Sequence, residues 1–259
     1  MRKTLTGIAI LMLLAVLGYA QTAADHIKAG DDAYAKFDDK AALDKYLEAI
    51  KIESNNYEAL WKASRAYVDI ADLVPGSGKE AKDRQMTLYG QGVDYAKKAV
   101  AANPNDTWGH FQVSASLGKK LLLQGNKEQV DNSKAVKIEI DRALELDAKN
   151  DLAWHALGRW QRRMAEIGGV TRLFGSILYG SIPKGSFNES ETDMKKAVEL
   201  NPNFINHHLE LGRTFLSLKK SDLASQEFQK CLELPVTISK DEMLKKEAQT
   251  ELDKLKQKK

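Results

Sequence analysis

Apolar side chains recur at helical spacing along most of this chain. In the run Trp154-His155-Ala156-Leu157-Gly158 the tryptophan and the leucine stand three residues apart, so they share one face of a helix. The glycine that follows has no side chain, and it leaves room for a second helix to pack closely. One such helix pair cannot bury its apolar face alone, so the pattern predicts that further copies stack on it.

Copies of this pattern occur on both sides of it. The last copy places Gly212 in its first helix and Phe228 in its second, and the first copy places Gly30 and Tyr46 at matching positions. A Trp-x-x-Leu-Gly start and a period of about 34 residues are typical of tetratricopeptide (TPR) repeats. We therefore predict an all-α, TPR-like superhelical solenoid of about five helix pairs.

Three of the copies contain extra residues between their two helices. The long inserts include residues 74–78, residues 124–126 and, the longest, roughly residues 167–190. Near the end of the chain, residues 239–242 (Ser-Lys-Asp-Glu) have the form of a capping box. They are predicted to start a charged helix that caps the last apolar face of the solenoid, as Asp25 is predicted to cap the first helix.

The first twenty residues have the pattern of a secretory signal peptide. Arg2 and Lys3 precede an unbroken apolar run over residues 8–17, and the small residues Gly18 and Ala20 allow cleavage before Gln21. The predicted domains are therefore a signal peptide, 1–20, and a TPR-like helical domain, 21–259. The protein would be secreted, or periplasmic in a Gram-negative cell; the alternative is a membrane anchor formed by residues 4–20.

Composition narrows the classes of function. The 259 residues are 43% hydrophobic and 29% charged, which suits a folded unit with a sizeable core. Removal of residues 1–20 takes away Arg2 and Lys3 and no acidic residue, so the formal charge falls from +3 to +1. This balance gives no support for nucleic acid as a partner. Cys231 is the only cysteine, so an intrachain disulfide is excluded.

The second half of the chain resembles a known family. The motifs Leu-Gly-Arg-Trp at 157–160 and Leu-Phe-Gly at 173–175, followed by a proline-containing loop and a helix that ends near Pro202, are similar to the regulator of microtubule dynamics family. The resemblance covers roughly residues 57–250. It implies a TPR-like helical domain that acts as a scaffold, and family members also have membrane-anchored forms.

The TPR resemblance implies which side chains face the concave groove. The first helices of a TPR stack line this groove, and one groove-facing position is arginine in three of the repeats: Arg65, Arg159 and Arg213. We expect these three to lie along one line of the stack and to form its charge-reading side. The other predicted groove residues are Trp61, Lys62, Trp108, Phe111, Gln112, His155, Arg162 and Glu210.

Arginines beside flat aromatic side chains indicate a site for an anionic ligand. A guanidinium group can grip a carboxylate or a phosphate with two hydrogen bonds. The leading hypothesis is a non-catalytic TPR scaffold that binds a protein or an acidic peptide in the groove. The alternative is a module for anionic lipid or membrane tethering, which would use the same arginines and residues 173–182. A simpler interpretation is that the arginines pair with neighbouring acids and that Trp61 and Trp108 belong to the core.

The longest insert carries an apolar stripe at helical spacing, formed by Leu173, Phe174, Ile177 and Leu178. We expect this stripe to pack on the neighbouring repeat; the alternative is that it touches a membrane or covers the groove.

The sequence carries no recognisable motif for catalysis or metal binding. His207 and His208 are adjacent and would diverge on a helix, and no metal-ligand spacing, nucleophile elbow, phosphate loop or dinucleotide fingerprint is present. We therefore expect no enzyme activity, no catalytic residues, no metal and no cofactor.

Overall fold

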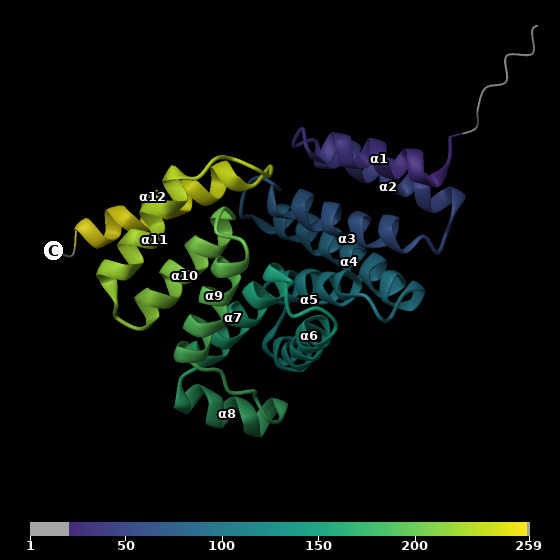
Figure 1. Cartoon of the computed structure of the whole chain (residues 1–259). Helices are drawn as coiled ribbons and strands as arrows, with labels where there is room; N and C mark the ends of the chain where they lie inside the picture. The colour runs from purple at the N-terminus through teal and green to yellow at the C-terminus, as the bar shows by residue number, and fades with distance from the viewer. Residues whose placement is uncertain (1–20, 258–259) are drawn as a thin grey trace, which may run out of the picture.

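The predicted all-α architecture is confirmed. A computed structural model describes residues 21–257, and these contain twelve helices and no strand (Figure 1). In chain order the helices are α1 (Ala23–Tyr34), α2 (Asp39–Ile52), α3 (Tyr57–Asp72), α4 (Lys79–Ala102), α5 (Thr107–Leu121), α6 (Asn126–Leu146), α7 (Asp151–Glu166), α8 (Gly169–Tyr179), α9 (Phe187–Leu200), α10 (Ile205–Ser217), α11 (Ser221–Glu233) and α12 (Asp241–Lys256).

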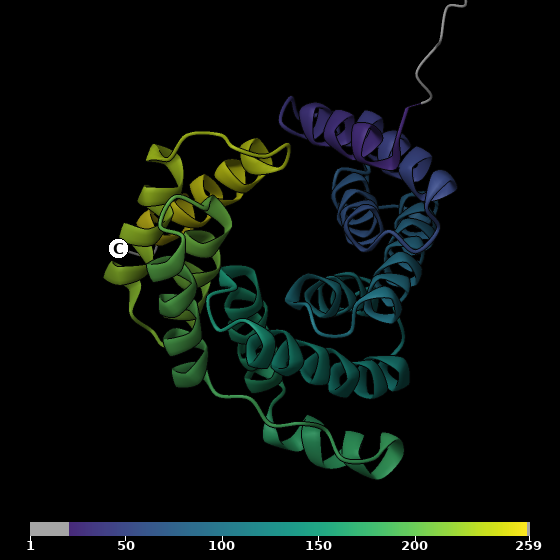
Figure 2. The ribbon, with the colours of Figure 1, turned by 45° about the vertical axis from the view of Figure 1, so that its right-hand side comes forward.

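The helices form five pairs that follow one another around an arc. The pairs are α1 with α2, α3 with α4, α5 with α6, α7 with α9 and α10 with α11, and α12 packs on the last pair. Figure 2 shows the pairs arranged around a central space, with α12 at the C-terminal end of the arc. The predicted solenoid and its capping helix are therefore present.

Close packing within the pairs rests on the small residue in the first helix and the large residue in the second. A Cβ atom at Gly212 would come within 2.5 Å of Phe228 Cε1, and one at Gly158 would come within 2.8 Å of Met194 Cγ. Phe228 and Met194 are fully buried. In these two pairs, the spacing that predicts the repeat is thus the spacing that lets the two helices pack closely.

Two predicted caps differ in the structure. The N-cap of α1 is Thr22, and Asp25 is its capping-box partner rather than the cap itself. The predicted capping box at 239–242 is wrong, because the N-cap of α12 is Lys240 and its side chain makes no capping bond. Asp241 instead accepts hydrogen bonds from the backbone N–H groups of Thr237 and Ile238 at 2.6 and 3.0 Å, which fixes the loop before α12.

That loop closes the arc on itself. Lys240 Nζ lies 2.7 Å from Asp69 Oδ1 and 3.1 Å from Asp72 Oδ2, at the C-terminal end of α3. Beside it, Ser239 donates a hydrogen bond to Asp39 Oδ2 at 2.5 Å. Side chains that are about two hundred residues apart in sequence therefore join the first repeats to the last.

The longest insert folds as a helix of its own, α8, and its packing differs from the expectation. Leu173, Phe174, Ile177 and Leu178 are 62, 61, 72 and 70% exposed, so the prediction that they pack on the neighbouring repeat is wrong. The inner face of α8 is instead covered by Ile182 from its own loop, a residue that is buried. The physical reason is local, because the loop after α8 covers the Gly175 side of the helix and the stripe is left on the outside.

Some sequence predictions fall outside this structure. The signal peptide, its cleavage before Gln21 and the alternative anchor at 4–20 all concern residues that lie outside the described part of the chain. Within residues 21–257, no helix has the length and apolarity that a membrane span requires.

A buried carboxyl group in α9 should make stability depend on pH. Asp193 is 7% exposed, and its Oδ2 has no hydrogen-bond partner among the described residues. Burial, reinforced by the charge of Glu189, raises the pKa of Asp193 from 3.8 to about 6. A raised pKa means that the folded state prefers the protonated carboxyl, so its contribution to stability is lost as the pH rises through about 6.

We therefore expect Asp193→Asn to raise the free energy of unfolding by about 2–3 kcal/mol at pH 8, measured by chemical denaturation. The gain should disappear near pH 4, where the wild-type carboxyl is protonated in the folded state. Asp131→Asn, at an exposed position of α6, is the matched control and should change little. An equal gain at both pH values would contradict a raised pKa of Asp193 as its cause.

Candidate ligand-binding groove

The concave side of the arc contains a cleft of about 520 Å³. Its walls come from α3, α5, α6 and α7, and the loop before α12 contributes Ile238 and Lys240. The lining is mostly apolar and aromatic, as is usual for ligand pockets. The main apolar side chains are Val68, Trp108, Phe111, Leu121, Val136, Ile140, Leu152, Trp160, Met164, Ile167, Phe204 and Ile238.

The charged part of the lining is predominantly cationic. Five basic side chains and two carboxylates face the cleft: Arg65, Lys119, Arg159, Arg163 and Lys240, with Asp69 and Glu166. Lys119 is neutralised by Asp72, whose carboxylate oxygens lie 2.7 and 2.8 Å from its Nζ, and Lys240 is neutralised by Asp69 and Asp72. The charge that remains for a ligand is therefore carried by the arginines.

Arg65 projects from α3 and has no carboxylate within ion-pairing distance among residues 21–257. Its guanidinium carbon lies 3.7 Å from the centre of the Tyr34 ring and 5.3 Å from that of Trp61, and Nη2 is 3.3 Å from Tyr46 Oη. Its Nε is buried and lacks an acceptor in the described chain. The aromatic rings thus hold a cation that is not neutralised.

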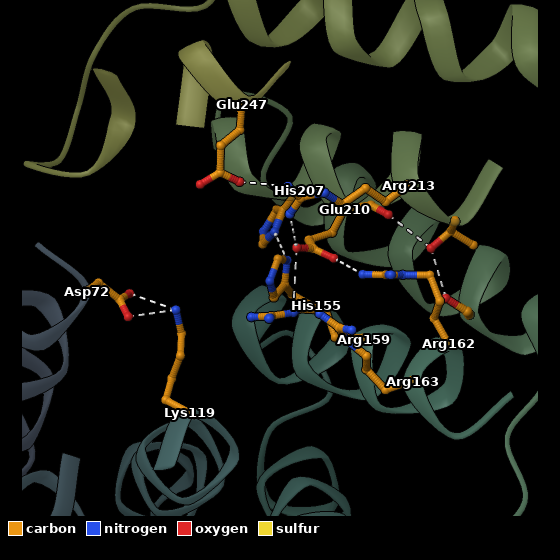
Figure 3. Close-up of polar contacts among 12 residues, drawn as sticks. Asp72, Lys119, His155, Arg159, Arg162, Arg163, His207, Glu210, Arg213 and Glu247 are labelled. Atoms are coloured by element: carbon orange, nitrogen blue, oxygen red, sulfur yellow. Dashed lines mark hydrogen bonds and ion pairs between the residues drawn. The ribbon is translucent and has the colours of Figure 1, made fainter. Parts of the chain in front are cut away.

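Arg159 projects from α7, beside Glu210 (Figure 3), and also lines the cleft. Its nearest carboxylate is that of Glu210, 3.7 Å from Nε, and its terminal nitrogens make no hydrogen bond to any residue in the described range. The side chain is 25% exposed. Arg65 and Arg159 are therefore guanidinium groups that an anion in the cleft can reach, whereas Arg163, the third arginine of the lining, pairs with Glu166 at 3.5 Å.

Arg162 and Arg213 belong to an internal ion network. Arg162 is buried and bonds to Glu210, and Arg213 lies 2.9 Å from Glu210 and 2.6 Å from Glu247 (Figure 3). Glu166 lies 2.9 Å from Nη1 of Arg162. Burial alone would raise the pKa of Glu210, but the surrounding arginines outweigh burial and hold that pKa well below its ordinary value. The interpretation that arginines pair with neighbouring acids describes these two residues.

The expected line of three arginines is therefore incomplete. Arg65 and Arg159 line the cleft, whereas Arg213 is not among the residues that line it. Arg213 instead donates to Glu210, three residues before it on α10, and to Glu247 on α12.

His155 forms part of a neutral wall. Its Nδ1 lies 3.0 Å from Nδ1 of His207, and His207 Nε2 lies 2.9 Å from the Asp151 carboxylate. Because the carboxylate accepts from Nε2–H of His207, the other nitrogen of His207 accepts from Nδ1–H of His155. Burial lowers the pKa of both histidines. His155 therefore brings an aromatic surface, rather than a charge, to the cleft.

The other predicted residues gather on the α3–α5 side. Trp61 stacks on Trp108 with ring centres 5.1 Å apart, and Phe111 meets Trp108 edge-on. Trp108 and Phe111 line the cleft together with Gln112. Lys62 is buried against Asp31 and Glu58, at 2.6 and 2.5 Å, so it offers no free charge.

Several lining residues were missed by reasoning from the repeats. Lys119 could have been predicted from helical spacing, because it stands about three turns after Trp108 on the same face of α5. Arg163 lies on α7 three residues after the Leu-Gly-Arg-Trp motif, so its position on the groove helix was the available signal. Ile238 and Lys240 had no such signal, since they reach the cleft only because the arc closes.

No group of three or more His, Cys, Asp or Glu side chains that would hold a metal ion is found within residues 21–257.

The fold and its inner groove define a TPR-like helical solenoid. Among solved structures, a thermophilic TPR protein from Thermus thermophilus superposes with a TM-score of 0.63 at 17% identity, over 89% of this chain and 99% of that one. A family model described as "Regulator of microtubule dynamics protein 1-3" matches residues 26–256. The chain belongs to this family.

Curated relatives extend the comparison. Regulator of microtubule dynamics protein 1 from Bos taurus is 27% identical over 76% of this chain and 61% of the relative, and that from Mus musculus is 28% identical over 76% and 63%. The Caenorhabditis elegans protein is 24% identical over 76% and 84%. The chain thus spans about three fifths of the length of the two mammalian relatives.

Proposed function

We propose that this protein is a non-catalytic scaffold that binds a protein partner through its groove, and that the occupant is an acidic peptide segment or a chain terminus. The observation that carries the proposal is the pair Arg65 and Arg159, two guanidinium groups that no described carboxylate neutralises fully, in a cleft whose lining is otherwise mostly apolar.

The chemistry of the walls suits such a peptide. A guanidinium group presents a planar fork that matches a carboxylate, and its hydrogen bonds are stronger in a cleft from which water is largely excluded. Trp108, Phe111 and Trp160 offer flat apolar surface beside the charges. A peptide with alternating acidic and large apolar side chains could engage both features at once.

The proposal predicts that Arg159→Glu weakens binding of a fluorescently labelled acidic peptide by about ten- to hundredfold, measured by anisotropy. Arg65→Gln should weaken it similarly, and this change breaks no ion pair within the described chain. Arg142→Glu is the control, because Arg142 is not among the residues that line the cleft and bonds to Glu145 and Asn105 on the exposed side of α6. Normal peptide binding by both groove variants, with unchanged helical melting, would sink the proposal.

A second candidate is an anionic lipid, favoured by the predominantly apolar lining of the cleft. An acyl chain would lie along Val136, Ile140 and Met164, and a phosphate would face Arg159. Lipid extraction from the purified protein, followed by mass spectrometry, separates the candidates. Stoichiometric phospholipid would favour the lipid, and a clean protein with a co-purifying partner would favour the scaffold.

We also propose that residues 1–20 are removed during secretion, so that the protein is secreted or periplasmic and starts at Gln21. The charge and apolarity of residues 2–17 support this placement. Sequencing of the N-terminus decides it: intact Met1 in a membrane fraction would favour the anchor at 4–20, and Met1 in soluble cytosol would contradict both.

A further inference from the structure

Helix α8 displays an apolar surface outside the groove. Leu173, Phe174, Ile177 and Leu178, here called the α8 patch, stand at spacings of one, four and five residues and therefore share one helical face. Each is at least 61% exposed, unlike the apolar residues of the repeat core. Four large neighbouring apolar side chains in water are costly, so this surface calls for an occupant.

The structure presents the α8 patch on a braced support. The Arg172 guanidinium donates hydrogen bonds to the backbone carbonyls of Met164, Ile167, Ile182 and Pro183, which ties both ends of the insert together. Ile182 packs beneath Gly175, where a Cβ atom would meet Ile182 Cδ1 at 2.7 Å. The inner side of α8 is therefore filled, and the patch cannot relieve its exposure by turning inward.

The position of α8 leaves the patch accessible. Figures 1 and 2 show α8 at the edge of the molecule, apart from the five helix pairs and on the side opposite α1. Its packing onto the remainder of the chain is slight and involves α6. The helix is thus held by its flanking loops more than by a helix partner.

Charge points to an anionic surface as the occupant. Residues 167–188 contain no aspartate or glutamate, although they include Arg172 and Lys184. Arg163, at the end of α7, has a half-exposed side chain close to the start of the insert, where it pairs with Glu166 at 3.5 Å. A basic segment around an apolar face matches an anionic bilayer surface.

Area argues against a protein partner at this place. A stable interface between proteins uses about 20–30 residues on each side, and an isolated helix with four apolar side chains is far smaller. Insertion at the boundary between lipid head groups and acyl chains needs no matching partner surface, and the gain scales simply with the apolar area buried.

We propose that α8 is an interfacial helix, which inserts the α8 patch into the head-group region of an anionic membrane. This site lies outside the groove and does not depend on what the groove binds. The protein would then dock on a lipid surface while its concave side holds a partner.

The test is flotation of the chain from Gln21 to Lys259, which contains every described helix, with phosphatidylcholine vesicles and with vesicles that also contain phosphatidylserine. Wild-type protein should float with both and more strongly with the anionic vesicles, at low salt above all. The double variant Phe174→Glu, Ile177→Glu should bind on the order of a hundredfold more weakly, because each buried side chain contributes about a factor of ten or more.

Two matched variants make the result specific. Ile52→Glu changes an exposed apolar residue outside α8, at the end of α2, where Ile52 is 50% exposed. This variant should leave flotation unchanged. Arg65→Gln alters the groove and should also float normally, so failure here is separable from failure of the groove proposal. The inference is overturned if wild-type protein does not float, if the α8 variant floats as well as wild type, or if the α8 variant instead turns a dimer into a monomer on sizing.

Discussion

Glu210→Gln is expected to lower the free energy of unfolding by about 3–5 kcal/mol, because it removes the charge of a buried ion network. Glu210 is only 4% exposed in its side chain and is contacted by Arg159, Arg162 and Arg213. Without the negative charge of Glu210, the guanidinium groups of the three arginines would repel one another at a buried site. Arg162 would suffer most, because it is buried and would keep Glu166 as its only carboxylate within the described chain.

Chemical denaturation followed by circular dichroism measures this effect, and Glu247→Gln is its matched control. Glu247 pairs with the same Arg213 but is 38% exposed, so its loss should cost less than about 1 kcal/mol. The folded state depresses the pKa of Glu210 below its ordinary 4.5, so the stabilisation is present above that value and is lost as the pH falls. The gap between wild type and variant should therefore stay constant from about pH 8 to about pH 5 and narrow in stronger acid. If Glu210→Gln and Glu247→Gln lowered the free energy of unfolding equally, the proposed buried network around Glu210 would be refuted.

The fold could be predicted from the sequence because a repeat contains both the glycine where the helices approach and the large residue that packs against it. Gly158 and Gly212 mark where a second helix approaches, and Met194 and Phe228 are the large residues that meet them. These relations are local, within about forty residues, so periodicity alone exposes them. Proline and glycine likewise marked the inserts, but they could not say that the third would fold as an extra helix.

The candidate groove could be predicted only in part. Arg65 and Arg159 line the cleft, as their repeat position implied, whereas Arg162 and Arg213 are occupied by Glu210. A repeat frame places a side chain on a face, but it does not say which neighbour neutralises it. That depends on the distance between α7 and α10, which the sequence does not state.

Helix α8 shows a second limit. Its stripe has the spacing of a core-facing helix, and such stripes are usually buried. Here the stripe is exposed because the loop after α8 returns beneath the helix and supplies Ile182 to its inner side. Spacing defines an apolar face, but it does not identify what covers that face.

The closure of the arc provides the second large prediction: Lys240→Met should lower the free energy of unfolding by about 3–5 kcal/mol and loosen the join between the first and last repeats. Asp69 and Asp72 have side chains only 5% exposed, and Lys240 lies between them. Burial would lower the pKa of Lys240, but the two aspartates outweigh burial and raise that pKa. The lysine therefore stays charged, and its contribution is present throughout the pH range below the ordinary lysine pKa.

Denaturation and amide hydrogen exchange measure the two parts of this prediction. Exchange should accelerate in residues 235–240 and at the C-terminal end of α3, because Lys240 holds these segments together. Lys254→Met is the control, since Lys254 forms an exposed pair with Glu251 and should cost less than about 1 kcal/mol.

Adding Asp69→Asn to Lys240→Met should recover part of the loss, because it removes one of the two carboxylates left facing each other. Ile238 and Lys240 also line the cleft, so the loosened variant should exchange a groove-bound peptide faster than wild type. Unchanged exchange in the loop would show that the arc is held closed by other contacts.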